Sequence, residues 1–223
     1  MSILAIDTCA NFCAAAVFDS KNRLQTHLRE DIGRGHAAHL LPIVEQVLDR
    51  ASCSFGDLTK VIVALGPGSF TGIRVGVAAA RGYGVALSVP VEGFSTFALL
   101  AAEAKRETGK TDMIVSIKGG RGQLFNQHIA ADGSLSGAPL IHELHQLDHV
   151  TLPSNACLVG NGALLLDPKG QLRQVLSERA TGDLDYALEA LMIDPRAPEP
   201  LYIRGADAKP QTGFALPRTM ENT

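Results

Sequence analysis

Clustered basic residues, cysteine pairs and long apolar stretches are all scarce in this chain of 223 residues. It has no run of five or more lysines or arginines, and its formal net charge is −3. Because phosphate backbones are bound by clustered lysine and arginine, we do not expect the chain to hold a nucleic acid tightly by itself. Any nucleic acid would have to be bound mainly by a partner protein.

The four cysteines, Cys9, Cys13, Cys53 and Cys157, are too few and too scattered for a disulfide framework. Buried reduced thiols are the favoured interpretation, and Cys9 with Cys13 is only a weak zinc signal. The first residues lack the basic segment and apolar run of a signal peptide, and no later stretch has the length of a membrane span. We therefore expect a cytoplasmic protein.

The composition is that of an ordinary globular protein, with 46% hydrophobic and 19% charged residues. Apolar runs at residues 3–7 and 13–18 and a loosely alternating pattern at residues 23–30, joined by short turns, predict three antiparallel strands. Hydrophobic spacing then predicts helices and strands in alternation: helix 36–51, which Pro42 kinks or begins, strand 60–65, helix 71–87, strand 89–91 and helix 95–106. This order predicts an α/β fold with a mixed sheet covered by helices.

The pattern changes after residue 109, where strands at 113–117 and 122–130 predict a hairpin. A strand at 158–159, a helix at 184–191 and a proline-rich linker or extended arm at 195–200 follow. We expect residues 1–106 to form an N-terminal subdomain that carries a partner interface. Residues 107–223 would form a smaller C-terminal subdomain, whose last segment packs back on the first.

The most informative segment is a glycine-rich loop that follows a buried strand and opens a helix: Gly66-Pro67-Gly68-Ser69-Phe70-Thr71-Gly72. Free backbone N–H groups and the positive end of a helix make such a loop a candidate anion or nucleotide site. A tight turn that binds nothing explains the glycines equally well. Its spacing is one residue longer than the dinucleotide fingerprint, and the Walker lysine is absent. The candidate residues are Asp7, Gly66, Gly68, Ser69, Thr71 and Arg74, with Ser69 or Thr71 as the helix N-cap.

Small residues recur at every fourth position of the helix after this loop, at Gly72, Gly76, Ala80 and Gly84. They form a flat stripe that another backbone can approach closely. The stripe either packs on the protein's own sheet or forms a seam with a partner helix.

From the sequence we predict no metal site and no catalytic residues. His36 and His39 share a helix face, and His142, His145 and His149 would share one if their segment is helical. Neither set comes with a carboxylate at a suitable spacing, so solvated polar faces are favoured. Asp7 is more suggestive, since a carboxylate at a strand end could orient a metal-bound phosphate or a water, or else cap the turn by bonding to the backbone at Cys9 or Ala10.

Three segments resemble the TsaB (YeaZ) family: Ile6-Asp7-Thr8, the stretch His36-Ala37-Ala38-His39-Leu40-Leu41-Pro42, and above all the glycine-rich loop as far as Gly76. Pro200-Leu201-Tyr202-Ile203-Arg204 is similar to the closing segment of that family. The resemblance implies an actin-like ATPase architecture with two ribonuclease-H-like subdomains. It also implies a non-catalytic dimerisation subunit of the bacterial machinery that places threonylcarbamoyl on the adenosine beside the tRNA anticodon.

The resemblance further implies that the paralogous subunit TsaD carries catalysis and that TsaE supplies an ATPase. ATP and metal would be handled by these partners, tRNA would be reached only through the complex, and the chain alone would form a homodimer. In TsaD a pair of metal-binding histidines follows the Val-Pro step; none follows Val89-Pro90 here, which favours a scaffold over an enzyme. Lys118 lies where the family usually has aspartate, which leaves the role of its loop open.

The family places the partner interface on the first two helices. The interface residues predicted in this way are His36, His39, Leu40, Val44, Gly72, Gly76, Ala80 and Gly84. The alternative is an enzyme of the same fold, either a nucleotide-dependent phosphotransferase or a metallopeptidase. Its support is limited to Asp7 and the glycine-rich loop.

Overall fold

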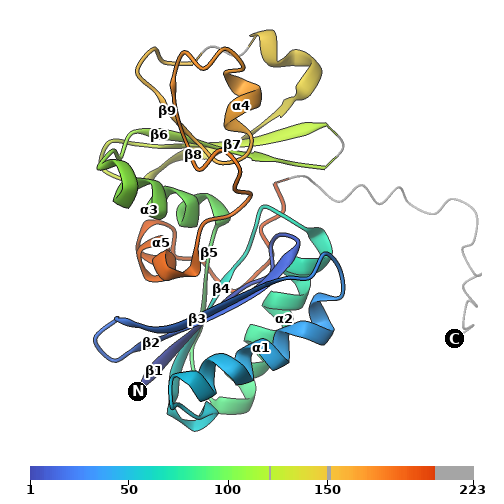
Figure 1. Ribbon diagram of the computed structural model, residues 1–223, viewed down its shortest axis with the longest axis vertical. Coiled ribbons are helices and arrows are strands. Elements are labelled where there is room, and N and C mark those ends of the chain that lie inside the picture. Colours follow the sequence, from blue (N-terminus) through green and yellow to red (C-terminus); the bar gives the residue numbers. More distant parts are fainter. Residues whose placement is uncertain (121, 150–151, 204–223) are drawn as a thin grey trace, which may run out of the picture.

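Two five-stranded mixed sheets with helices between and beside them make up the chain (Figure 1). The computed structural model describes residues 1–120, 122–149 and 152–203. The first sheet comes from the N-terminal half, and the second follows helix α3 (Thr96–Thr108). The chain then returns to the first sheet through its last described segments.

The first sheet has the strand order β3-β2-β1-β4-β5. Its strands are β1 (Ser2–Asp7), β2 (Phe12–Asp19), β3 (Leu24–Asp31), β4 (Leu58–Ala64) and β5 (Val91–Phe94). β2 pairs antiparallel with β1 and with β3, whereas β4 runs parallel to β1 and to β5. Seven of the eight residues of β2 are buried, because helices cover both faces of the sheet there.

The second sheet repeats this topology with the order β10-β9-β6-β7-β8. Its strands are β6 (Met113–Lys118), β7 (Gln123–Ile129), β8 (Leu135–Glu143), β9 (Cys157–Val159) and β10 (Arg173–Val175). β6, β7 and β8 form an antiparallel meander, and β9 lies parallel to β6 and to β10. Each sheet is therefore a three-stranded antiparallel unit extended by two parallel strands.

Two pairs of helices cover the first sheet (Figure 1). Helices α1 (His36–Arg50) and α2 (Phe70–Leu87) lie on its outer face, whereas α3 and α5 (Ala187–Ile193) lie between the two sheets. All nine residues 96–104 of α3 are buried because it packs against both hydrophobic cores. The remaining short helices are α4 (Ala163–Leu166) and the 3-10 segments η1 (Phe55–Asp57), η2 (Leu144–His149) and η3 (Leu184–Tyr186).

The last described segments pack back on the first sheet. Leu184, Ala187 and Ala190 belong to its hydrophobic core. Beyond α5, Arg196 and Gly93 exchange two backbone hydrogen bonds of 2.8 and 2.9 Å beside β5. Residues 195–200 therefore form an extended arm along the first subdomain.

The prediction of an α/β fold with actin-like topology is confirmed. Of the two alternatives for Pro42, the start of the helix is wrong, because α1 begins at His36 and Pro42 lies inside it. Another local prediction also differs from the structure. The helix predicted over residues 184–191 is a 3-10 turn followed by α5, which continues to Ile193.

The stripe of small residues on α2 packs on the protein's own first subdomain. A Cβ added at Gly72 would overlap the carbonyl oxygen of Thr8, and one at Gly76 would overlap the Thr8 hydroxyl oxygen. The same hydroxyl donates a 2.7 Å hydrogen bond to the carbonyl oxygen of Gly72. At the other end of α2, a Cβ at Gly84 would overlap the Val91 side chain of β5. Of the two readings of the stripe, packing within the chain is the one that the structure supports.

This packing predicts opposite effects for two glycines of the same helix. Gly72→Ala should lower the free energy of unfolding by ~1–3 kcal/mol, because the backbone carbonyl of Thr8 cannot yield easily to the new methyl group. Gly82→Ala is the matched control, since a Cβ there meets no atom within 4 Å. It should leave stability unchanged or raise it by up to about 1 kcal/mol, through helix propensity alone. Urea unfolding followed by circular dichroism measures both; equal effects would contradict the packing role.

Candidate functional site

The end of β1, the glycine-rich loop and the start of α2 meet at the turn of residues 8–10. Asp7 ends this strand and is fully buried. Its Oδ1 accepts a hydrogen bond of 2.7 Å from the backbone N–H of Cys9, and its Oδ2 accepts one of 2.9 Å from the Thr181 hydroxyl. Both oxygens of the carboxyl group are thus engaged within the chain, and the bond to Cys9 is the turn-capping role considered for Asp7.

The environment of this turn keeps its titratable groups unreactive. Burial raises the pKa of Asp7, although the hydrogen bonds from Cys9 and Thr181 oppose the shift. Burial, together with the nearby Asp7 carboxyl, raises the pKa of Cys9 well above its usual range. For Cys13, mainly burial raises the pKa to about 11. At neutral pH neither thiol is a thiolate, which is the reactive form of cysteine.

The glycine-rich loop directs several of its polar groups at the chain itself. Ser69 is the N-cap of α2, accepts a 3.2 Å hydrogen bond from the Gly72 N–H, and donates its own N–H to the Cys9 carbonyl oxygen at 2.6 Å. The carbonyl oxygen of Pro67 accepts a 2.7 Å hydrogen bond from the Thr96 hydroxyl. Gly68 is needed because a Cβ there would overlap the Cys9 carbonyl. The close approach of two backbones thus accounts for the glycines without a ligand.

The six candidate loop residues do not form one open site. Asp7 and Gly66 are buried, whereas Gly68, Thr71 and Arg74 are exposed. Asp7 does not face a ligand from solvent in this structure, because its side chain has no exposed surface. An anion contact at the exposed loop residues stays a prediction.

Arg74 is held on the surface by two aromatic rings. Its guanidinium lies 3.7 Å from the centroid of the Phe70 ring, and its Nε donates a 2.8 Å hydrogen bond to the Tyr202 hydroxyl. The Phe70 and Tyr202 rings are themselves in contact, with centroids 5.4 Å apart. The closing segment of the chain is thereby attached to the start of α2, and this aromatic group stays partly exposed.

Most of the predicted interface residues lie inside the molecule, which corrects their assignment as surface contacts. His36, Leu40, Val44, Gly72, Gly76 and Ala80 are buried. His36 has a structural role, since its Nε2 lies 2.7 Å from the carbonyl oxygen of Ala10. His39 is exposed and Gly84 is partly exposed.

The outer faces of the same two helices carry other residues, many of them small or apolar. On α1 the exposed residues include Ala37, Ala38, His39, Leu41, Pro42 and Glu45, and on α2 they include Thr71, Arg74, Ala78, Arg81, Gly82, Val85 and Ala86. Leu41 is 48% exposed and Val85 is 84% exposed. These residues, termed here the outer helix face, form the surface that a partner would meet on this layer.

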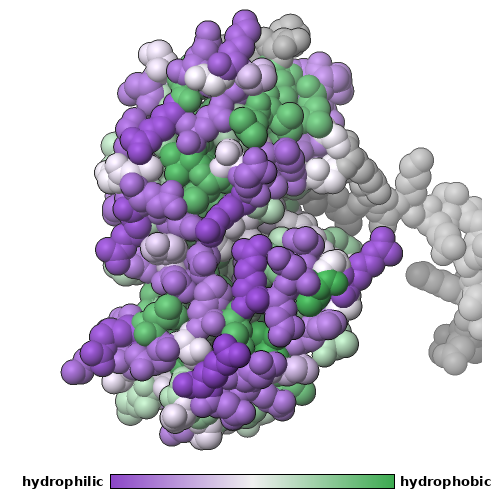
Figure 2. Space-filling view, in the orientation of Figure 1, coloured by the Kyte–Doolittle hydropathy of each residue, from purple (hydrophilic) through white to green (hydrophobic). Residues whose placement is uncertain are grey.

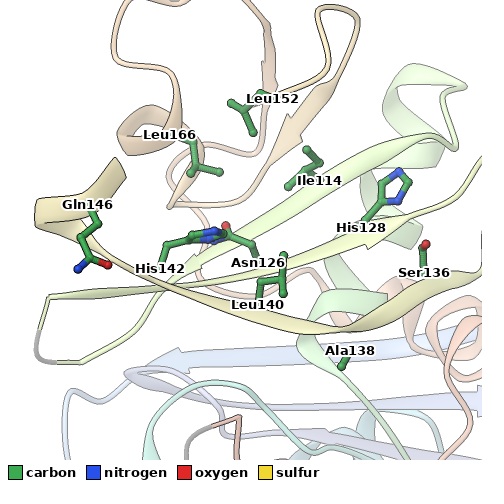
Figure 3. A pocket seen from close by; sticks show the side chains of 10 residues that line it. All are labelled: Ile114, Asn126, His128, Ser136, Ala138, Leu140, His142, Gln146, Leu152 and Leu166. Carbon is green, nitrogen blue, oxygen red and sulfur yellow. The ribbon is translucent and has the colours of Figure 1, made fainter. Parts of the chain in front are cut away.

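A cavity of about 550 Å³ lies on the outer face of the second sheet, between β7, β8 and α4 (Figure 3). Asn126 and His142 point toward each other in it, with Asn126 Nδ2 and His142 Nδ1 2.7 Å apart. Figure 2 shows hydrophobic side chains gathered on the upper half of the molecule. Leu140, which lines the cavity, is 61% exposed. Among the described residues, the cavity is lined by aliphatic and polar side chains, with no carboxylate, lysine or arginine.

The three histidines of this region do not form one helical face. His142 belongs to β8, whereas His145 belongs to the 3-10 segment η2. The side chain of His149 lies outside the described residues.

Lys118 is the last residue of β6, and its backbone N–H donates a 2.8 Å hydrogen bond to Asn161 Oδ1. Arg121, in the loop that follows, lies outside the described residues.

Comparisons with known proteins agree with this geometry. A family model described as TsaD, tRNA N6-adenosine threonylcarbamoyltransferase, matches residues 27–136. Over 123 residues the chain is 35% identical to the tRNA threonylcarbamoyladenosine biosynthesis protein TsaB of Buchnera aphidicola (subsp. Schizaphis graminum), which is 55% of this chain and 58% of that one. It is 33% identical to TsaB of Escherichia coli K12 over 56% of this chain and 53% of that one. The matches therefore span little more than half the length of these curated relatives.

The crystal structure of YeaZ from Pseudomonas aeruginosa shares the fold, with a TM-score of 0.75 at 24% identity, over 90% of this chain and 99% of that one. Two sheets of the same mixed topology, one in each subdomain, place the chain in the actin-like ATPase fold class. The sequence matches and this shared fold make the chain similar to the TsaB (YeaZ) proteins. In the part of the chain that the structure describes, none of the helices combines the length and the apolar character needed to cross a bilayer.

The buried carboxyl group of Asp7 predicts the direction in which stability changes with pH. Because the pKa of Asp7 is raised above 3.8 in the folded state, its contribution to stability is fully present below pH 3.8 and is lost as the pH rises through the folded-state pKa. Asn at this position does not titrate, can accept from Cys9 through Oδ1, and can donate to the Thr181 hydroxyl oxygen. Asp7→Asn should therefore be at least as stable as the natural chain at pH 7, with the difference shrinking below pH 3.8.

Thermal and urea unfolding between pH 3 and pH 8 measure this difference. Thr181→Val is the control, since it leaves a buried carboxyl oxygen without its donor and should destabilise by ~1–3 kcal/mol at pH 7. A clear loss of stability in Asp7→Asn at pH 7 would contradict the inferred effect of burial.

Proposed function

We propose that this chain is the non-catalytic partner subunit of a tRNA threonylcarbamoyladenosine-modifying complex and pairs with a TsaD subunit through its outer helix face. The relatives in Buchnera and Escherichia coli are named for this biosynthesis, and the matching family model is that of the transferase itself. A partner subunit that shares its fold with the enzyme explains both matches.

The observation that carries the proposal is the composition of the outer helix face. Ala78, Gly82 and Val85 follow one another at helical spacing on α2, and Leu41 is exposed on α1. A Cβ at Gly82 would meet nothing within 4 Å, so a partner backbone has room to approach there. Small and apolar side chains on a rigid helix layer favour close packing with another protein.

The turn at residues 8–10 supports a role without catalysis of its own. Asp7, which precedes the turn, is sealed from solvent, and the thiols of Cys9 in the turn and of Cys13 on β2 are protonated at neutral pH. Such groups are poorly suited to act as a base or a nucleophile toward a substrate. In this proposal ATP and the catalytic metal are handled by TsaD and by the ATPase TsaE.

The net charge of −3 fits a subunit that reaches tRNA only through the complex. In the absence of TsaD, the same apolar outer helix face would pair with a second copy of the chain, giving a homodimer. The complex and its tRNA would be cytoplasmic.

Placing a charge on the outer helix face should weaken the pairing. Val85→Glu and Leu41→Glu are each expected to reduce affinity for TsaD about 10–100-fold, because a carboxylate would lose its hydration in the interface. Met192→Glu is the matched control, since Met192 is also 84% exposed but lies on α5. Calorimetric titration with purified TsaD gives the affinities. If Val85→Glu binds TsaD as tightly as Met192→Glu, the interface lies elsewhere.

The second candidate function is an enzyme of the same fold, such as a nucleotide-dependent phosphotransferase, which the exposed part of the glycine-rich loop favours. In our proposal, isothermal titration of the isolated chain with ATP and Mg²⁺ gives no binding in the micromolar range, because Ser69 and Gly72 N–H groups already have partners. Addition of TsaD should restore nucleotide binding to the mixture. Micromolar binding by the isolated chain would favour the enzyme.

A further inference from the structure

Three side chains with metal-binding atoms meet at the edge of the first sheet, although they come from opposite ends of the chain. His27 lies on the edge strand β3, and Asp183 and Asp185 lie at the start of η3. The Nδ1 atom of His27 is 3.0 Å from Oδ1 of Asp183 and 3.0 Å from Oδ1 of Asp185. Within residues 1–120, 122–149 and 152–203, this is the one group of three such residues whose ligand atoms all lie within 4.8 Å of one another.

The two nitrogen–oxygen distances match ligand separations around a metal ion. An ion with ligand bonds of ~2.1 Å separates ligands at right angles by about 3.0 Å. The imidazole nitrogen and each carboxylate oxygen have this separation before any ion is added. The side chains therefore need little rearrangement to bind a cation in common.

We propose that His27, Asp183 and Asp185 bind a divalent first-row transition ion, such as Zn²⁺ or Mn²⁺, with water in the remaining positions. One nitrogen and two oxygen ligands suit these ions, whereas Mg²⁺ and Ca²⁺ prefer oxygen ligands alone. The ion accepts the lone pair of Nδ1, so any proton on that nitrogen is released to solvent when the ion binds. Two carboxylates and a neutral imidazole carry two negative charges, which the ion neutralises.

The surroundings of the three side chains hold Asp183 in place by hydrogen bonds and leave Asp185 accessible from solvent. The backbone N–H of Asp183 donates to Glu103 Oε2 at 2.9 Å, and its Oδ1 accepts from the Asp185 N–H at 3.2 Å. Glu103 is in turn paired with Arg179 at 2.7 Å, so this arginine's charge is already countered. The Asp185 side chain is 43% exposed, whereas that of His27 is 17% exposed, and an ion would enter from the aspartate side.

The other ring nitrogen of His27 limits the affinity. Its Nε2 is buried and has no hydrogen-bond partner among the described residues. Metal-bound histidines usually donate this N–H to a carboxylate or carbonyl, and loss of that bond weakens binding about 10–100-fold. A dissociation constant in the micromolar range is therefore expected.

Such an ion would be structural, and so distinct from the catalytic metal that the proposed function leaves to the partner. It would join β3 to η3, whose Leu184 is part of the core of the first sheet. Because an ion that binds only the folded state stabilises it, the melting temperature should rise with ion concentration.

The test uses the full chain after treatment with a chelator and dialysis. Calorimetric titration with ZnCl₂ and with MnCl₂ should show one ion per chain with micromolar affinity for at least one of them. A rise in Tm at saturation should accompany binding, and MgCl₂ and CaCl₂ should bind at least tenfold more weakly. Asp185→Asn and His27→Gln should each weaken binding at least tenfold.

Asp112→Asn is the matched control, because His128 Nε2 and Asp112 Oδ1 form a 2.8 Å pair without a third ligand. It should bind the ion as the natural chain does. Asp185 is exposed, so Asp185→Asn decides the matter even if His27→Gln fails to fold. Millimolar or absent binding, or equal binding by the natural chain and Asp185→Asn, would show that the cluster is an ion pair alone and overturn the proposal.

Discussion

The close approach of α2 to the turn of residues 8–10 is the constraint on which the first subdomain depends. Two glycines of the helix face Thr8, and Gly68 of the preceding loop faces the Cys9 carbonyl. No side chain larger than hydrogen fits at these contacts without moving a backbone, because protein interiors are close-packed. The hydrogen bond from the Thr8 hydroxyl to the Gly72 carbonyl then holds the helix against the end of β1. The position of α2, and with it the outer helix face, follows from this one contact.

The same constraint gives the glycine-rich loop a meaning other than that of a phosphate loop. A loop that binds an anion presents its backbone N–H groups outward. Here Ser69 donates to the Cys9 carbonyl, and Gly72 donates to the Ser69 hydroxyl. Asp7 lies beneath this turn with both oxygens occupied. The loop therefore packs α2 against the turn after β1, and an anion contact at its exposed residues stays a prediction.

The sequence was most informative where a pattern is local. Alternating short turns predicted the three antiparallel strands, and Ser69 was one of two predicted N-caps of α2. It was least informative where a contact joins distant segments: Thr181 and Asp7 are 174 positions apart, and no spacing rule relates His27 to Asp183. Helical periodicity identified the stripe of small residues on α2 but left open which neighbour it meets. That question depends on tertiary packing, since a sheet and a partner helix both accept a flat face.

The last described segments of the chain return to the first subdomain and cover the inner side of its sheet. The outer helix face is left largely exposed to solvent. Thr181 caps the buried carboxyl, Arg196 pairs with the edge of β5, and Tyr202 holds Arg74 at the start of α2. These contacts cover the inner side of the sheet and the turn after β1 from one direction. On the outer helix face the last described segment contacts Arg74 at the start of α2, whereas Val85 near the end of the helix is 84% exposed. The carboxyl group of Asp7 has its hydrogen bonds satisfied within the chain, so any binding energy toward a partner would have to come from the small and apolar side chains of the outer helix face rather than from this buried group.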